Sequence, residues 1–340
     1  MADSEIGSGS GLKLPRALKI LLQLALTGVV LFFIVRIMGL NLGDLAQFDL
    51  ASWAWRPIPL AGSVLLLLAG YIYSSLLWRQ MVVEMGGPRI SAMTAVRIFM
   101  VANLGRYVPG KVLQIAGLAM LARREGVSAA TATSAAVLGQ AFALAGATIL
   151  GLGAFFGDHT RYRIYGWVGL AVMVALIVLS SIPGPSRHLQ LLWMRVAARS
   201  GSDSAEEHET GAAVLGLGEA GFGLRWTGRY LLNWVIYGGA FWLLFLGMEE
   251  WATFLTIAPA FAAAYVVGYL AFFMPAGGGV REGMLIVLLA PIIGQTNGAA
   301  VAVLARVWTT VVEVLPAGMM APGVLRGAGS ETTASSGNDP

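Results

Sequence analysis

Six charged side chains are notable because they lie within or beside long apolar stretches. They are Arg106, Lys111, Arg281, Glu282, Arg306 and Glu313. A charge inside an apolar span is costly, and it is a functional candidate by default. Guanidinium and ammonium groups hydrogen-bond to phosphate, and carboxylates pair with protons or cations. These residue types therefore predict a substrate site for an anionic group, with acids that balance charge or take a proton, a sodium ion or a cationic headgroup.

Proline and glycine interrupt two of the apolar stretches, 91–122 and 255–292, near 107–111 and 274–279. Such residues end helices, so each stretch is expected to contain a helix break. The residues expected to act as hinges are Pro109, Gly110, Pro275, Gly277, Gly278 and Gly279.

Each break places cations near the start of a new helix. Arg106 and Lys111 flank the first break, and Arg281 follows the second. The start of a helix offers unpaired N–H groups and the positive end of its dipole, which favour an anion. Two such half-sites would suit a phosphate.

Structural alternatives stay open for the same charges. Arg106 and Lys111 could extend to the membrane interface. Arg306 could pair with Glu282, and Arg281 with Glu313, only to hold the fold together. Arg306 and Glu313 are seven residues apart and would share one face of a helix.

The composition identifies an integral membrane protein. Of 340 residues, 57% are hydrophobic and only 12% are charged, about half the charged fraction of a soluble domain. Six stretches are long enough to cross the hydrocarbon core. They are 17–38, 58–78, 128–156, 164–182, 230–248 and 298–320. We therefore predict an all-α polytopic fold with six full spans and two broken hairpins, which are either re-entrant or paired spans.

The same composition excludes several kinds of chemistry. The chain has no cysteine, so disulfides, thiolate metal sites and thiol nucleophiles are excluded. Its three scattered histidines form no metal-ligand pattern, and we expect no metal and no cofactor. The net charge of +4 comes from cations beside the spans, which membrane topology explains without nucleic acid.

Polar segments and basic residues indicate the domain organisation. We expect disordered cytoplasmic tails at 1–14 and 323–340, and one transmembrane domain at 15–322 with a cytoplasmic loop at 183–224. Basic residues before the first span place the N-terminus in the cytoplasm, and the span count places the C-terminus there too. The expected location is the plasma (inner) membrane, crossed several times.

An internal repeat appears when the sequence is shifted by 166 residues. This shift superposes Pro109 on Pro275, Gly117 on Gly283 and Gln140 on Arg306. Repeat one covers about 15–156 and repeat two about 160–322. By the span count the repeats run in opposite directions, and inverted repeats with discontinuous helices are typical of transporters.

Two further patterns indicate structural roles. Small residues recur at every fourth position of the third predicted span, which favours close helix packing. They are Ala135, Gly139, Ala143, Ala147 and Gly151. Trp226 lies near the end of a predicted span and was assigned to the aromatic belt at the membrane interface.

The segments around the two breaks, residues 103–111 and 274–283, together resemble the signature segments of the lysylphosphatidylglycerol synthase transmembrane-region family of flippase-like proteins. The resemblance covers about 15–322. It implies movement of a lipid across the membrane by the membrane part. It does not imply synthase activity, because residues 323–340 leave no room for the soluble transferase domain. The family often has Glu where this chain has Gln140, so a carboxylate mechanism in the first repeat is in doubt.

From these observations we expect a flippase-like transporter for an anionic or aminoacylated phospholipid or a polyprenyl-phosphate-linked lipid, and not an enzyme. Its partners would be membrane lipids, and a separately encoded lipid synthase or glycosyltransferase is a further candidate partner. Two alternatives remain at this stage. One is an intramembrane transferase that uses Glu282 or Glu313 as a base, and the other is a non-catalytic membrane partner of a separate enzyme.

Overall fold

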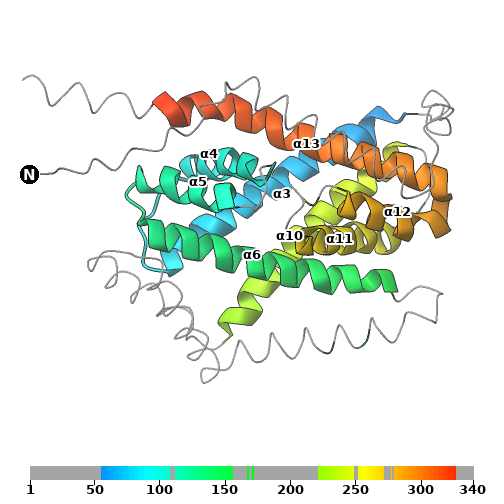
Figure 1. The fold of residues 1–340 in the computed structure, drawn as a ribbon, viewed down its shortest axis with the longest axis horizontal. Helices are drawn as coiled ribbons and strands as arrows, with labels where there is room; N and C mark the ends of the chain where they lie inside the picture. Colours follow the sequence, from blue (N-terminus) through cyan, green and yellow to red (C-terminus); the bar gives the residue numbers. More distant parts are fainter. Residues whose placement is uncertain are drawn as a thin grey trace, which may run out of the picture.

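A computed structural model of the chain describes residues 55–107, 112–155, 167, 171, 221–248, 252–271, 277 and 279–326. Helices make up the secondary structure of these ranges (Figure 1). They are α3 (Pro57–Glu84), α4 (Ala92–Asn103), η2 (Leu104–Tyr107), α5 (Val112–Arg123), α6 (Ala129–Leu152), η3 (Gly153–Phe155), α10 (Phe222–Gly247), α11 (Phe254–Leu270), α12 (Val280–Ile293) and α13 (Gln295–Arg326).

Four of the described helices are long and apolar enough to cross a membrane. They are α3, α6 with η3, α10 and α13, and the chain is a multi-pass membrane protein. They correspond to the predicted spans at 58–78, 128–156, 230–248 and 298–320. The predicted span at 17–38 lies outside the described residues, and so does the one at 164–182 apart from Trp167 and Ala171.

Helix α10 begins at Phe222, eight residues before its predicted start. The additional residues at the start of α10 contain two cations, Arg225 and Arg229. In the structure, both arginines pair with Glu84 at the end of α3, with N–O distances of 3.1 and 3.2 Å. The Nε1 atom of Trp226 donates to the same carboxylate at 2.9 Å. Trp226 is fully buried, so the prediction that it belongs to an interfacial belt was wrong: its ring stacks on Phe142 of α6, with centroids 6.5 Å apart.

The two interrupted stretches form pairs of short helices. In the first, α4 and α5 have 12 residues each, or about 18 Å of helix at 1.5 Å per residue, against a hydrocarbon core of about 30 Å. Ser91 caps α4 by accepting a hydrogen bond from the Thr94 N–H at 3.0 Å. In the second, α11 has 17 residues and α12 has 14. At the first pair the described backbone changes from α4 to the 3-10 helix η2, and at the second Gly279 precedes α12 with a positive φ of 90°.

The long helices frame the short pairs (Figure 1). Helix α13 runs along one side of the molecule and α6 along the other, while α3 and α10 cross between them. The α4–α5 pair lies toward one end and the α11–α12 pair toward the other. Helix α6 packs against α5 and α11, and α13 packs against α12 and α4. Each outer helix therefore contacts both short pairs.

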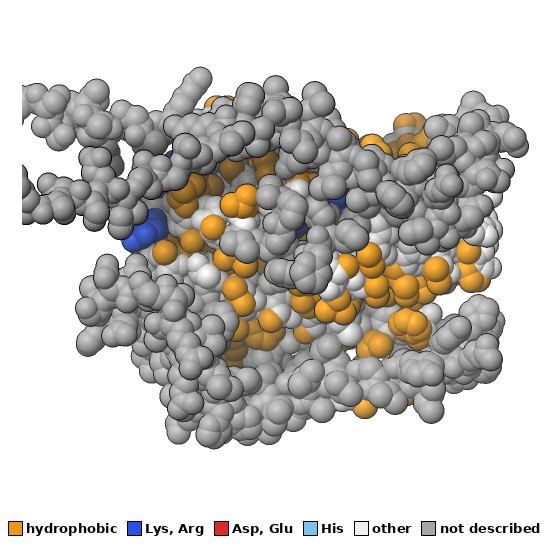
Figure 2. All heavy atoms as spheres, viewed as in Figure 1, with side chains coloured by type: hydrophobic (Ala, Val, Ile, Leu, Met, Phe, Trp, Pro, Cys, Tyr) orange, Lys and Arg blue, Asp and Glu red, His pale blue; other side chains and the backbone are white. Residues whose placement is uncertain are grey.

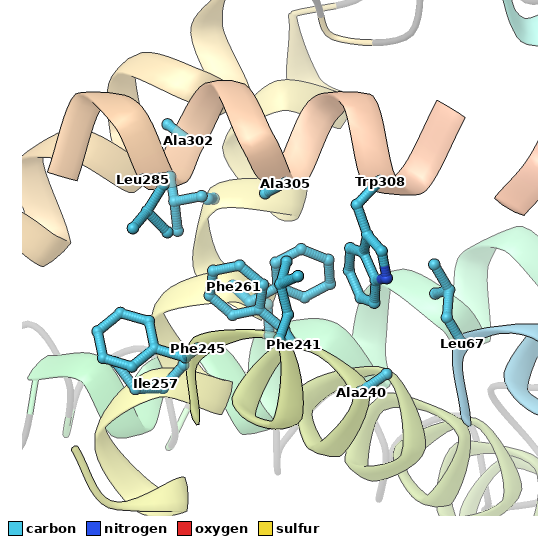
Figure 3. Packing of buried hydrophobic residues seen from close by; sticks show 14 of the residues in the cluster. Leu67, Ala240, Phe241, Phe245, Ile257, Phe261, Leu285, Ala302, Ala305 and Trp308 are labelled. Carbon is cyan, nitrogen blue, oxygen red and sulfur yellow. The ribbon is translucent and has the colours of Figure 1, made fainter. Parts of the chain in front are cut away.

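An aromatic cluster fills the core between α10, α11 and α13 (Figure 3). The rings of Phe241 and Phe261 stack with centroids 4.5 Å apart, and Trp308 packs against both at 6.4 and 6.3 Å. Leu285 from α12 and Ala305 from α13 complete the contact region shown in Figure 3. Hydrophobic side chains also cover much of the described surface in Figure 2, where cations are few, as expected for a surface in contact with lipid.

The small residues of α6 allow its neighbours to approach closely. Ala135 and Ala147 are fully buried. A Cβ atom on Gly151 would lie 2.8 Å from the backbone nitrogen of Ala263 in α11, and one on Gly139 would lie 2.5 Å from the Tyr230 hydroxyl in α10. The predicted packing role of this stripe is therefore present in the structure.

We predict that Gly151→Leu destabilises the protein by about 1–3 kcal/mol, the usual cost of overpacking a filled interior. The side chain would press on the α11 backbone, which cannot rotate away. Thermal unfolding in detergent measures the effect. Gly228→Leu on α10 is the matched control, since no atom lies within 4 Å of a Cβ built there. Equal unfolding temperatures for the two variants would contradict this account of α6 packing.

Candidate functional site

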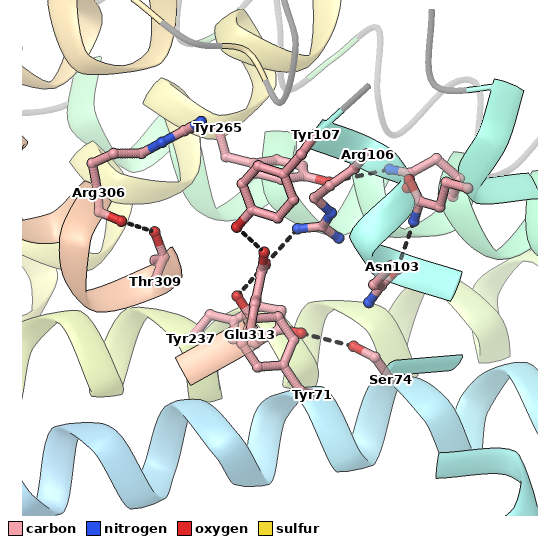
Figure 4. Close-up of polar contacts among 12 residues, drawn as sticks. Tyr71, Ser74, Asn103, Arg106, Tyr107, Tyr237, Tyr265, Arg306, Thr309 and Glu313 are labelled. Carbon is pink, nitrogen blue, oxygen red and sulfur yellow. Dashed lines mark hydrogen bonds and ion pairs between the residues drawn. The ribbon is translucent and has the colours of Figure 1, made fainter. Parts of the chain in front are cut away.

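The carboxylate of Glu313 joins three elements that are distant in sequence (Figure 4). It accepts hydrogen bonds from the Tyr71 hydroxyl of α3 at 2.5 Å, and from Arg106 Nη1 and the Tyr107 hydroxyl of η2, both at 2.6 Å. The Glu313 side chain is 7% exposed and that of Arg106 is 24% exposed. This ion pair, with its buried carboxylate and two additional hydroxyl donors, fixes η2 at the first break against α3 and the middle of α13.

Arg306 and Glu282 form a second ion pair, with Nη1 and Oε1 3.4 Å apart. The other oxygen of Glu282 accepts from the Gly279 N–H at 2.6 Å and so caps the start of α12. The Arg306 guanidinium also lies over the Tyr107 ring, 5.9 Å from its centroid. Glu282 therefore binds an N–H group at the start of α12, which the sequence analysis had predicted as part of a site for an external anion. Arg306 connects α12 with the first break, because it contacts both Glu282 and Tyr107.

Arg281 differs from the other two arginines of this region. Its guanidinium lies 4.9 Å from the centroid of the Phe261 ring, and no ion pair with a described carboxylate accompanies this contact. Two glycines allow it to sit close to α11. A Cβ atom on Gly268 would lie 2.6 Å from the Arg281 Cβ, and one on Gly277 would lie 2.6 Å from the Gly268 carbonyl oxygen. Gly277 also has a positive φ of 68°, which favours glycine.

Two neighbouring cavities lie beside these charges. Their volumes are about 120 and 40 Å³. Both are bounded by Arg106, Gln114, Gln140, Tyr265, Tyr269, Arg281, Thr309 and Glu313. The larger one continues between aromatic and small residues of α3, α6 and α10, among them Trp78, Gly139 and Trp234. It combines a charged end with an apolar wall and takes residues from every long helix and both short pairs.

Amide side chains complete the polar end of the cavities. Gln140 Nε2 donates to the Tyr265 hydroxyl at 3.3 Å, and Gln114 Nε2 donates to Asn103 Oδ1 at 2.6 Å. Gln140 therefore contacts the second half of the chain as a neutral group. Within the described ranges, no three His, Cys, Asp or Glu side chains come together as a metal site requires.

The structure brings four of the six candidate residues into one network around the first break and α13. Arg306 pairs with Glu282, as the structural alternative expected, and Arg106 pairs with Glu313, which was not expected. The other expected pair, Arg281 with Glu313, is replaced by Arg106 with Glu313 because η2 lies directly against α13. Arg281 lines both cavities. Lys111, Pro109, Gly110, Pro275 and Gly278 lie outside the described residues.

Neither Tyr71 and Tyr237 nor the cavity-lining role of the small residues of α6 was predicted from the sequence. Tyr71 and Tyr237 are related by the same shift of 166 residues, and their ring centroids are 5.5 Å apart. That relation was available in the sequence as a signal. Ala135, Gly139 and Ala143 line the larger cavity as well as packing helices. Their small side chains leave the space that larger residues would fill.

A family model for the lysylphosphatidylglycerol synthase TM region matches residues 20–317. The match covers α3, α6 and α10 in full, both predicted breaks, and α13 as far as residue 317. In the corresponding comparisons, no curated protein and no solved structure matches the chain.

We predict that Glu313→Gln lowers stability by about 1–3 kcal/mol, because Arg106, which is partly buried, loses its counter-ion and the two tyrosine hydroxyls lose a charged acceptor. Thermal unfolding in detergent measures this loss. In the double variant Arg106→Gln/Glu313→Gln, the loss should be smaller than the sum of the two single losses. Strictly additive losses would show that the two side chains do not interact.

We also predict that Gly277→Ala displaces Arg281, since the new methyl group meets the Gly268 backbone and the positive φ is strained. Binding of inorganic phosphate or a short-chain anionic lipid should weaken about tenfold or more, as expected when a charged contact of about 1.5–3 kcal/mol is lost. Isothermal titration calorimetry measures the change. Gly283→Ala on α12 is the control, because a Cβ there has no neighbour within 4 Å. Unchanged binding in Gly277→Ala would overturn the positioning role.

Proposed function

Since the chain belongs to the lysylphosphatidylglycerol synthase transmembrane-region family, we propose that it is a flippase-like transporter that moves an anionic lipid across the plasma membrane. The phosphate of the lipid binds in the cavity beside Arg281. The lipid tails remain in the bilayer.

The observation that carries the proposal is the difference between Arg281 and its neighbours. Arg106 and Arg306 each pair with a carboxylate at 2.6 and 3.4 Å. Arg281 lines both cavities and contacts an aromatic ring. A cation at a membrane-buried cavity needs an anion to offset its desolvation, and a lipid phosphate supplies one.

The arrangement of helices supports transport by alternating access. When the bounds of α3 are shifted by 166 residues they become 223–250, which nearly coincide with α10 at 222–247. The bounds of α6 shifted in the same way become 295–318, which lie within α13 at 295–326. The shift relates α6 to α13, α3 to α10 and α4 to α11, and the packing has the same symmetry. Helix α6 packs on α10 and α11, while α13 packs on α3 and α4. Two inverted repeats around a central site would give the protein two equivalent conformations, one open to each side.

The remaining architecture is part of the proposal. The short helices α4, α5, α11 and α12 form re-entrant hairpins that enter from opposite faces, and both termini lie in the cytoplasm. Non-helical backbone at membrane depth requires protein or water around it, and the long helices supply that cover. Lys111, Pro109, Gly110, Pro275 and Gly278 are proposed members of the two breaks. A separately encoded synthase or glycosyltransferase would supply the lipid.

The carboxylates favour transport over a transferase reaction. A general base needs a free oxygen near the proton it removes. Glu313 already accepts hydrogen bonds from three donors, and Glu282 accepts from a helix start and pairs with an arginine. We propose that Glu282, Glu313, Arg106 and Arg306 hold the breaks in place around the lipid phosphate.

Transport is tested with purified protein in vesicles that contain fluorescent phosphatidylglycerol. The wild-type protein should expose labelled lipid to dithionite in the outer leaflet faster than empty vesicles do. Arg281→Gln should slow this movement about tenfold or more, since a charged hydrogen bond contributes about 1.5–3 kcal/mol. Arg97→Gln, an exposed cation on α4 that is not among the cavity-lining residues, is the matched control.

Two results would refute the proposal. One is wild-type protein that moves no tested anionic lipid, whether phosphatidylglycerol or a polyprenyl-phosphate-linked sugar. The other is full transport by Arg281→Gln in protein that unfolds at the same temperature as the wild type.

A further inference from the structure

One buried amide beside the cavity has an unused hydrogen-bond acceptor. Asn233 of α10 is 2% exposed. Its Nδ2 donates to Ser74 Oγ at 2.7 Å, and Ser74 Oγ is paired with the Tyr237 hydroxyl at 2.8 Å. The Asn233 Oδ1 has no hydrogen-bond partner among the described residues. Figure 4 shows the Ser74–Tyr237 contact next to Tyr71, which contacts Glu313.

An unpaired buried acceptor is costly, so each one in a native structure requires an explanation, and a bound group that donates to it is one such explanation. Asn233 is among the residues that line the larger cavity, together with Ser74 and Tyr237. The other buried side-chain atom without a partner, Trp308 Nε1, belongs to a residue that lines neither cavity. The position of Asn233 therefore links its unpaired oxygen to the occupant of the cavity.

The charges of the cavity limit that occupant further. Among the described residues that line the larger cavity, Arg106 and Arg281 are cationic and Glu313 is anionic, which leaves one positive charge. A headgroup with one negative charge would neutralise it. For an ammonium group, Glu313 is the one carboxylate among the described residues that line this cavity. Glu313 already accepts hydrogen bonds from an arginine and two tyrosine hydroxyls.

We propose that Asn233 forms a headgroup subsite, and that the cavity selects lipids with a single anionic phosphodiester followed by an uncharged, hydroxyl-bearing group. A hydroxyl of that group donates a hydrogen bond to Asn233 Oδ1 while the phosphate binds at Arg281. Phosphoglycerol and a sugar linked to a polyprenyl phosphate share this chemistry. The inference rests on the proposed transport function and narrows its substrates, excluding aminoacylated and other ammonium-bearing headgroups.

Aromatic side chains provide the competing recognition mode. Tyr71, Trp78 and Trp234 line the same cavity, and such rings attract ammonium groups. If they decide selectivity, lipids with an ammonium group move fastest. The two modes therefore predict opposite orders of substrates.

The experiment compares labelled lipids with different headgroups in vesicles that contain the full chain, and all the glycerophospholipids have identical tails. Phosphatidylglycerol and a polyprenyl-phosphate-linked hexose are anionic with hydroxyls, and phosphatidylmethanol is anionic without a hydroxyl. Phosphatidylethanolamine and lysyl-phosphatidylglycerol carry ammonium groups. We expect the two hydroxyl-bearing lipids, or one of them, to move at least tenfold faster than the last two lipids, and several-fold faster than phosphatidylmethanol.

Variants separate the subsite from a general effect on folding. Asn233→Leu should reduce transport of the hydroxyl-bearing lipid about tenfold, to the rate of phosphatidylmethanol, and should leave phosphatidylmethanol transport unchanged. Asn233→Asp keeps the side-chain shape and adds a negative charge to the cavity. It should raise phosphatidylethanolamine transport relative to phosphatidylglycerol by about tenfold.

The outcomes distinguish the inference from the proposed function. If the wild-type protein moves no lipid, the transport function itself fails. If it moves lipids but prefers those with ammonium groups, the subsite is wrong and transport stands. Equal losses for phosphatidylglycerol and phosphatidylmethanol in Asn233→Leu would also overturn the subsite, because they would show only a structural role for Asn233.

Discussion

The structure depends above all on how Glu313 is satisfied inside the membrane domain. An ionised carboxylate without partners is too costly at this depth, and Glu313 has an arginine and two tyrosine hydroxyls within 2.6 Å. Those donors come from α3 and from η2, while the acid comes from α13. The requirement to neutralise one charge therefore fixes the first helix break against the last long helix.

The second break is also fixed to α13 by a neutralised carboxylate, here that of Glu282. Glu282 caps α12 through the Gly279 N–H and pairs with Arg306 of α13. Helix α13 thus holds both breaks, one through Glu313 and the other through Arg306, on the side of the helix that also faces Tyr107. The two breaks are therefore connected through charged side chains of one helix.

The residues that provide the charge at the cavity differ from those that provide its space. Two arginines are neutralised within the protein, whereas Arg281 lies against Phe261 at a cavity with a net positive lining. The small residues of α6 open the cavity, and Gly268 with Gly277 let Arg281 approach it. Packing, which is the main driving force for helix association in a membrane, here also sets the shape of the cavity.

The sequence by itself determined the membrane class, the family, the four long helices that the structure describes and the short list of charged candidates. Hydrophobic length and the Pro/Gly breaks are local properties, so periodicity and composition reveal them. Tertiary structure decided which charges pair. Arg106 and Glu313 are 207 residues apart, and their contact depends on the packing of η2 against α13. It also decided that Trp226 is buried and that Tyr71 and Asn233 lie at the cavity, since burial of a side chain depends on neighbours that no local pattern specifies.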